Sequence, residues 1–541
     1  MNNLDDKHLS AAVEALGPHL VEFLCACPLG QINASNAQAW GIILQIDSVL
    51  TVNLGEAADP DTMTRVLIAN LANEVDGKSV GLISHLQSGG VVGMPEATEQ
   101  LDRLVITISA NCYPLILLPT EEYLRDIPGR LNTQVASALF QLESAKEFRR
   151  LVLEDAALAA VFKHHSEMSG HTTSMIYRST GHGSELQLWM LLDLVFAGAV
   201  RSSSIAGVLS PIGEFVESAL RRWQLIRRVL TSNVSQSVPA RLAFSGVRLP
   251  SPGPYEFGSL KIREVNDLDT DVVPKHLKGD LTGTNSVGES VLIDYSGDVV
   301  VETTIPYIVR FVDQADGEPS SFPAYPQDIL DKNNLAEASQ RLRASLLFSV
   351  EREHRVQIVP SWQFVDDPLE HGTSSGWNDP RQAVGLMPTQ LTEADIKSWR
   401  HWYDLLGVEG SSKVDIALSR VLRASAERRD PVDVLIDAVI AWENLFGSSN
   451  GELKLRITAS MARLLEAEPA KRMELRAELG SIYNLRSRAV HGSGKPKQSE
   501  MKLCYEALDY AIKVIKVVFE FRSDLIAEKD GTERGMKLLM E

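Results

Sequence analysis

Cysteine is scarce in this chain, with four among 541 residues. Cys25 and Cys27 are separated by one residue, and no second pair of cysteines or histidines lies near them in the sequence to complete a zinc site. We therefore expect these two, together with Cys112 and Cys504, to be reduced thiols in the core of a cytoplasmic protein.

Long apolar runs are also missing. The run from Leu188 to Val200 is short and contains Asp193, which predicts a buried helix rather than a membrane span. The N-terminus, from Met1 to Asp6, is acidic and polar, and a secretory signal would need a basic flank there. The sequence thus predicts no membrane partner.

Positive charge is in deficit, and the formal net charge is −18. Repulsion from phosphates opposes non-specific binding of nucleic acid over the whole surface of such a protein. Residues 451–500 are an exception, with ten Lys and Arg against six Asp and Glu. A polyanion is better placed there than elsewhere on the chain.

The length exceeds what one hydrophobic core usually serves, which predicts about three domains. Residues 1–240 are expected to be mostly helical. A β-rich or α+β middle module with a linker is expected over 241–385. Residues 386–541 alternate long amphipathic patterns with short Gly, Ser and Pro breaks, which predicts an all-α bundle.

Several shorter elements can be predicted inside these regions. The β-branched alternation of Leu104 to Ile108 favours a strand, whereas Gly41 to Ile46 fits a strand or a helix. The runs 290–295 and 299–305 flank Ser296-Gly297-Asp298, which predicts a hairpin. Helical spacing appears over 335–350, a final strand over 355–365, and a long loop over 366–390.

Five residues between 164 and 182 are candidates for metal binding. Ligands on one helix need a spacing of three or four residues, but adjacent histidines face different ways and Gly170 interrupts the helix expected there. We expect no metal and no cofactor, and interpret this group as polar surface residues: His164, His165, Glu167, His171 and His182.

Chemistry is concentrated in the stretch Tyr483 to Gly492, where Arg486 precedes His491 by five positions. Arginine offers a permanent cation with a planar donor fork that suits phosphate. Imidazole titrates near neutral pH and can take or give a proton. The two together can cleave RNA without a metal, with Arg486 offsetting the charge that builds on the phosphorus centre.

A spacing of five residues places the two side chains about 140° apart around a helix, so they can meet only at a helix end or opposite a second chain. A structural alternative stays open. A cation at a helix C-terminus is favoured by the helix dipole alone, and Gly492 is an ordinary residue to follow a helix.

Residues 431–520 resemble the HEPN superfamily, in particular ApeA-like HEPN domains at the C-termini of bacterial abortive-infection proteins. The resemblance rests on Ala441 to Phe446 with its acidic Glu443, on Leu455 to Leu465, and on Tyr483 to Gly492. The last stretch is similar to the family's Tyr-x-x-Arg-Ser-x-x-Val-His-Gly form of an Arg-x4–6-His motif.

The resemblance implies a homodimeric, metal-independent endoribonuclease, with Arg486 and His491 as the catalytic pair in a cleft shared by two subunits. RNA, with tRNA as one candidate, would be the substrate, and a phage-derived molecule would be the trigger. Glu443, Ser487 and Arg488 are expected to support the pair, with Glu443 orienting Arg456, Arg463 or Arg486. The cations expected to bind RNA are Arg456, Arg463, Lys495 and Lys497.

The chain departs from the family pattern at two positions. Many active members carry Asn, Asp or His directly after the arginine, where Ser487 stands here. Some members are silenced by modification of a tyrosine two residues after the histidine, and Ser493 occupies that position.

Three functions stay open on the sequence alone. The chain can be an RNA-cleaving effector of anti-phage or stress defence, a non-catalytic HEPN module that dimerises or binds nucleic acid, or a regulatory scaffold whose activity lies in its N-terminal part.

Overall fold

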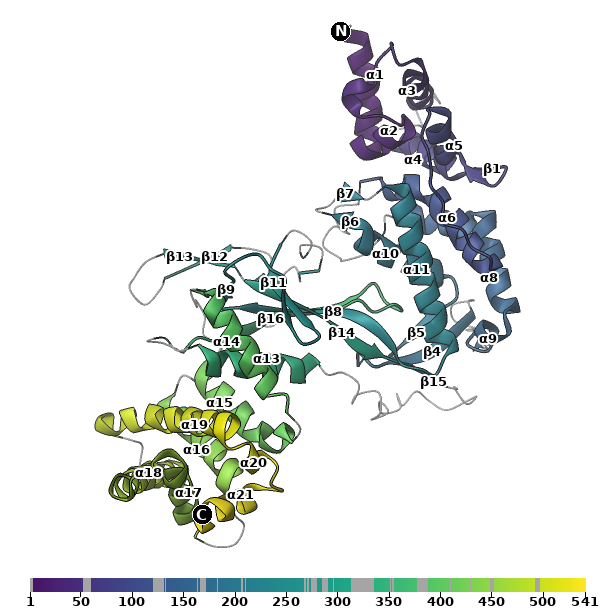
Figure 1. The fold of residues 1–541 in the computed structure, drawn as a ribbon. Helices are drawn as coiled ribbons and strands as arrows, with labels where there is room; N and C mark the ends of the chain where they lie inside the picture. Colours follow the sequence, from purple (N-terminus) through teal and green to yellow (C-terminus); the bar gives the residue numbers. More distant parts are fainter. Residues whose placement is uncertain are drawn as a thin grey trace.

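The architecture is taken from a computed structural model of the full chain, which runs from an N-terminal group of helices through a sheet-containing region to a C-terminal helical bundle (Figure 1). The structure describes residues 3–51, 60–119, 131, 133–162, 164–165, 172–181, 183–205, 208–209, 211–266, 269, 272–273, 280–284, 290–294, 296–312, 335–350, 352, 355–376, 388–408, 410–428, 430–447, 452–491 and 497–541.

The N-terminal region is mainly helical, as predicted. Long helices α6 (Gln100–Ile116) and α11 (Ile212–Thr231) pack against each other, and further helices complete the region. These are α1 (Asn3–Leu16), α2 (Pro18–Leu24), α3 (Ala37–Leu50), α4 (Pro60–Ala72), α5 (Val80–Gln87), α7 (Thr133–Gln141), α8 (Glu143–Glu154), α9 (Ala156–Ala159) and α10 (Met190–Ser203).

The strand predicted over Leu104 to Ile108 is wrong, because these residues lie inside helix α6. Leu101, Val105, Ile108 and Cys112 are all buried at helical spacing, so a seventeen-residue helix overrides a short β-branched run. The ambiguous run 41–46 is likewise helical and belongs to α3.

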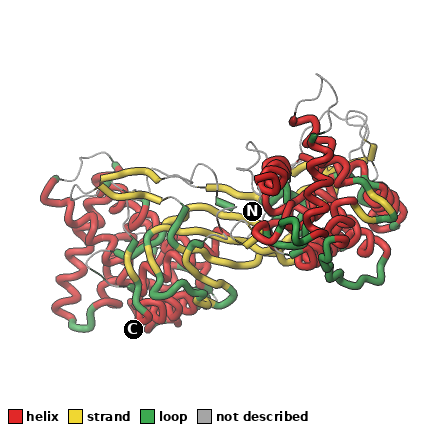
Figure 2. The backbone as a smooth tube through the Cα atoms, turned by 90° about the horizontal axis from the view of Figure 1, so that it is seen from above, coloured by secondary structure: helices red, strands yellow, loops and turns green. Residues whose placement is uncertain are grey.

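The largest sheet has six antiparallel strands in the order β10-β11-β14-β8-β16-β17. The central strands are β8 (Gln236–Ser245) and β14 (Val299–Tyr307). Around them lie β10 (Tyr255–Phe257), β11 (Leu260–Glu264), β16 (Val359–Val365) and β17 (Thr373–Gly376). Figure 2 shows the strands between the two helical regions.

A smaller sheet joins the N-terminal helices to the strand region. Its order is β15-β4-β3, and β5 also pairs with β4. The strands are β3 (His164–His165), β4 (Thr172–Arg178), β5 (Gly183–Gln187) and β15 (Val309–Val312). The helix expected at 164–165 is therefore a strand, and His171 and His182 lie outside the described residues.

The predicted hairpin between 290–295 and 299–305 does not form. Strand β13 (Ser290–Asp294) pairs with β12 (Asp280–Thr284), whereas β14 pairs with β8 and β11 on its two edges. Three valines at the start of β14 are buried, which places this strand in the middle of the sheet with no edge left for β13.

The loop expected over 366–390 contains two strands, β17 and the short β18 (Thr389–Gln390). Its first residues are held by a buried charged cluster. Asp366 accepts hydrogen bonds from Arg201 at 2.8 Å and from Arg222 at 3.1 Å. Asp367 accepts a hydrogen bond from the hydroxyl of Tyr307 at 2.6 Å. This part of the loop is therefore fixed against helices α10 and α11.

Helix α13 (Leu335–Ser349) forms where predicted and leads to the C-terminal bundle. The bundle begins at a capping box, in which Thr392 and Asp395 exchange hydrogen bonds at the start of α14 (Glu393–Leu405). It continues through α15 (Asp415–Ala426), α16 (Pro431–Phe446), α17 (Leu453–Leu465), α18 (Pro469–Val490), α19 (Met501–Phe521), α20 (Ser523–Ile526) and α21 (Gly531–Met540). No separate helix was predicted from the sequence for α21.

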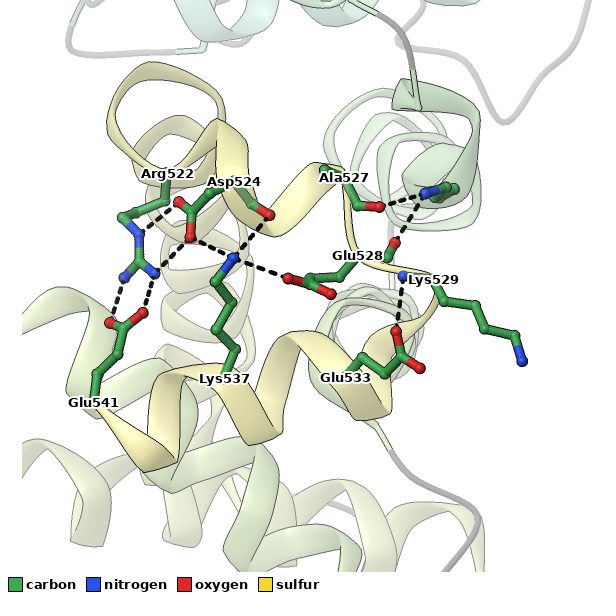
Figure 3. A network of polar contacts seen from close by, with 9 residues as sticks. Arg522, Asp524, Ala527, Glu528, Lys529, Glu533, Lys537 and Glu541 are labelled. Carbon is green, nitrogen blue, oxygen red and sulfur yellow. Dashed lines mark hydrogen bonds and ion pairs between the residues drawn. The ribbon is translucent and has the colours of Figure 1, made fainter.

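Helix α21 is held by a buried arginine and by ion pairs toward its C-terminal end. The guanidinium of Arg534 is 1% exposed and donates to the carbonyl oxygens of Asn444 and Leu445, both at 2.9 Å. Figure 3 shows the outer contacts, where Arg522 binds Glu541 at 2.6 Å and Lys537 binds Asp524 at 2.9 Å. The end of the chain is thus tied to the last turn of α16.

Two large clusters of buried apolar residues form the core. One contains side chains from the N-terminal helices and the sheet, and the other fills the C-terminal bundle. Helix α13 contributes Leu342 and Leu346 to the first and Leu347 and Phe348 to the second. In the described part of the chain, no helix combines the length and the apolar character that crossing a bilayer requires.

Candidate active site

The stretch singled out in the sequence lies at the C-terminal end of helix α18. The helix ends at Val490, and the backbone N–H of His491 still donates to the carbonyl of Ser487 at 3.1 Å. Arg486 therefore sits in the last two turns, and His491 caps the helix.

Glu443 is the residue around which this end of α18 is organised. It lies in the last turn of α16, and helices α16 and α18 pack against each other. Its Oε1 accepts a hydrogen bond from the hydroxyl of Tyr483 at 2.8 Å, and its Oε2 lies 3.4 Å from Nη2 of Arg486. Of the three arginines considered for Glu443, the structure places Arg486 against it.

The site is partly shielded from water. Glu443 is 23% exposed and Arg486 is 20% exposed, so both groups are reachable yet less screened than free surface ions. Burial, and then the hydrogen bond to Glu443, raises the pKa of Tyr483 to about 12. Tyr483 is therefore a neutral hydrogen-bond donor at physiological pH.

His491 does not join this group within one chain. Its side chain is exposed, and it has no polar partner among the residues that the structure describes. The five-residue offset rotates it about 140° from Arg486 around the helix axis. A single chain thus presents the cation and the imidazole at the same helix end but on different faces.

Two further candidate residues are tied to the start of the next helix. Arg488 donates to Oε1 of Glu500 at 2.6 Å, and the backbone N–H of Lys497 donates to Oε2 of Glu500 at 2.9 Å. The Lys497 N–H, and after it Arg488, holds the pKa of Glu500 below its ordinary value. Ser487 is half-buried, and Lys495 lies outside the described residues.

The expected RNA-binding arginines of helix α17 lie apart from Glu443. Arg456 and Arg463 are half-buried, and within the described ranges their side chains have no hydrogen-bond or ion-pair partner. The neighbouring Lys454 donates to Oδ1 of Asn484 on α18 at 2.8 Å. These two arginines remain candidates for phosphate contacts, but they do not orient Glu443.

Sequence reasoning gave Tyr483 no role, although the structure places it on Glu443. A signal was present in the spacing. Tyr483 precedes Arg486 by three residues, so on a helix both lie on one face and reach the same neighbour.

Metal-ligating residues do not gather in the described part of the chain, where no group of three or more His, Cys, Asp or Glu side chains is suitably placed. Cys25, Cys112 and Cys504 are free and buried, and Cys27 is free and half-buried. Burial raises the pKa of Cys504 to about 11, so this thiol stays protonated at neutral pH.

Comparison of the chain with models of protein families, with curated proteins and with solved structures gave no match.

Proposed function

We propose that the chain is a metal-independent, HEPN-type endoribonuclease effector of anti-phage defence, acting by abortive infection, or of stress defence. The contact of Glu443 with Arg486, beside an exposed His491 at the same helix end, is the observation that supports this proposal most. No cofactor is required by this chemistry.

The reaction needs a proton carrier and a cation at one phosphodiester. His491 takes the proton of the ribose 2′-hydroxyl, whose oxygen attacks the adjacent phosphorus, or it returns a proton to the 5′-oxygen that leaves. Arg486 stabilises the negative charge that builds on the phosphate oxygens. Glu443 holds the guanidinium in place, and the flanking cations bind neighbouring phosphates.

A second copy of the chain would complete the site. Arg486 and His491 are set about 140° apart around α18, so a second chain offers each of them a partner of the other type. Two bundles that meet at this helix end would line a shared cleft with both residues from each chain. In this arrangement residues 1–240 and 241–385 sense the trigger or restrain the nuclease, and residues 386–541 form the dimer.

The test is expression of the wild type and of the His491→Ala and Arg486→Ala variants, in the presence and absence of an inducing phage. We expect the wild type to arrest growth and fragment cellular RNA, and each variant to abolish both, because the loss of one acid–base or electrostatic group costs about 100-fold or more in rate.

Two matched variants control for folding and charge. His401→Ala removes an exposed histidine from helix α14, and Arg476→Ala removes a cation from α18 nearly three turns before Arg486. Both should behave like the wild type. Intact RNA with the wild type, or equal fragmentation by the wild type and the His491→Ala variant, would refute the catalytic assignment.

The separation of Arg486 from His491 within one chain favours a second candidate, a module that binds RNA without cutting it. This module would retain RNA in a binding assay and leave it intact. The Arg486→Ala variant would then weaken binding, and the His491→Ala variant would not.

A further inference from the structure

The two oxygens of the Glu443 carboxylate have different partners. Oε1 accepts the hydrogen bond of the Tyr483 hydroxyl at 2.8 Å, and Oε2 faces Nη2 of Arg486 at 3.4 Å. Both partners come from one face of helix α18, so the hydroxyl and the guanidinium approach the same carboxylate side by side.

A carboxylate and a guanidinium that meet alone prefer a fork in which two parallel N–H groups bind two oxygens. The contact of Arg486 with Glu443 is instead single and long. The Nε of Arg486 is buried and has no partner among the described residues, although a fork would give it or a second Nη an acceptor. The hydroxyl of Tyr483 uses one of the two acceptor positions of the oxygen that such a fork would need, and so competes with the fork.

We propose that Tyr483 is a positioning residue that competes with Arg486 for Glu443 and so prevents a two-oxygen fork, which leaves Nη donors of the partly exposed guanidinium for an RNA phosphodiester. This inference rests on the proposed endoribonuclease function. Glu443 then anchors the arginine through one oxygen, and the rest of the donor fork serves the substrate.

The Tyr483→Phe variant removes only the hydroxyl and keeps the ring in the core. The freed Oε1 then closes the fork on Arg486, which tightens the existing ion pair and withdraws guanidinium donors from the phosphate. We expect KM for an RNA oligonucleotide to rise about tenfold, the usual effect of losing a charge-assisted hydrogen bond, with a smaller change in kcat.

Two comparisons separate positioning from general damage to the fold. In a Glu443→Gln background no carboxylate fork can form, so Tyr483→Phe should change KM less than about twofold. A matched control is Tyr510→Phe on helix α19, which removes a hydroxyl that donates to Glu478 on α18 at 2.8 Å. That variant should leave KM unchanged.

A readout independent of cleavage is the ¹⁵N–¹H signal of Arg486 Nε in the full chain, identified by its loss in Arg486→Lys. We expect Tyr483→Phe to shift this signal relative to the wild type. In the double variant, Tyr483→Phe with Glu443→Gln, the signal should stay near its position in the Glu443→Gln single variant. A wild type that leaves RNA intact but shows this shift would refute the nuclease and keep the positioning role. Unchanged KM and an unchanged Nε signal in Tyr483→Phe would overturn the positioning role even in an active nuclease.

Discussion

Glu443 is a carboxylate shared by a phenol and a guanidinium, and it lies where the last turn of one helix meets the last turns of another. A charge that is three-quarters shielded from water is stable only because both oxygens are bonded. Its two partners would lose their acceptor together if the carboxylate were removed.

Glu443→Ala should therefore lower the free energy of unfolding by about 2–3 kcal/mol, since a hydrogen bond to a charged group is lost and two polar groups stay without a partner. Denaturation in urea, followed by circular dichroism, measures this. Glu478→Ala on the exposed face of α18 is the control, with an expected loss below about 1 kcal/mol. Equal losses for the two variants would contradict the buried role of Glu443.

The contact between Glu443 and Arg486 was predictable in part from the sequence. Arg486, His491 and Glu443 stood out because their residue types and spacing carry chemistry by themselves. The choice of Arg486 over Arg456 and Arg463 was not predictable, since it depends on the rotation of α18 against α16. Whether these residues cleave RNA stays a prediction.

At the scale of helices and strands, helix α21 packs on the outside of the C-terminal bundle, against α16 and α17. Its buried Arg534 places a cation at the C-terminus of α16, where two carbonyl groups have no partner within their own helix. Gly535 of α21 lies close to the end of α16, because a Cβ atom at position 535 would be 3.2 Å from the carbonyl oxygen of Phe446.

Arg534→Ala should destabilise the protein by about 2–4 kcal/mol, because it unbonds two buried carbonyl groups and leaves a cavity. Arg522→Ala removes another arginine that holds α21, in this case through ion pairs on the outside of the bundle. It should lower the free energy of unfolding by less than about 1 kcal/mol. Thermal unfolding of both variants checks the order of the two effects. A larger loss for Arg522→Ala would show that the ion pairs, and not the carbonyl contacts, hold the helix.

The helices of the bundle were mostly predictable because their starts carry strong local signals, such as Thr392 with Asp395 and Asp430 before Pro431. Helix α21 was missed although Asp530 caps its start, since Gly531 and Gly535 weaken its helical pattern. The hairpin at 290–305 failed for a different reason. Pairing partners in a sheet are chosen by burial on both edges, which a local pattern does not contain.

Across the whole molecule, one buried charged cluster joins three parts of the chain that are far apart in sequence. Asp366, after strand β16, meets Arg201 of α10 and Arg222 of α11. The fit is tight, since a Cβ on Gly198 would lie 2.4 Å from Nε of Arg222. Burial alone raises the pKa of Asp366, but Arg222 and Arg201 outweigh it and hold the pKa below its ordinary value of 3.8.

A folded-state pKa below the unfolded one means that Asp366 stabilises the fold above the unfolded value of 3.8. The contribution is lost as the pH falls through the lower, folded-state pKa. We expect an Asp366→Asn variant to be less stable than the wild type at pH 7, and this difference to shrink as the pH falls through the lowered, folded-state pKa of Asp366. A series of urea titrations at falling pH measures the difference in the free energy of unfolding, and a constant difference would contradict this linkage.

The arrangement of the cores was the part least accessible to the sequence. Composition and loop length indicate where domain boundaries lie, but they do not show which apolar side chains pack together. Leu342 and Phe348 lie six positions apart on one amphipathic helix and serve different cores.

Because helix α13 packs in both cores, it limits which segment of the chain can be transferred to another protein together with the C-terminal bundle. A gene segment that began at residue 386 would encode every helix from α14 onward, yet it would lack Leu347 and Phe348, which pack in the bundle core. Trp402 would lose the ring of Phe348 that lies 5.5 Å from it, centre to centre. Recombination that transplants this bundle into another protein has to carry α13 with it, so the exchangeable unit begins before residue 335.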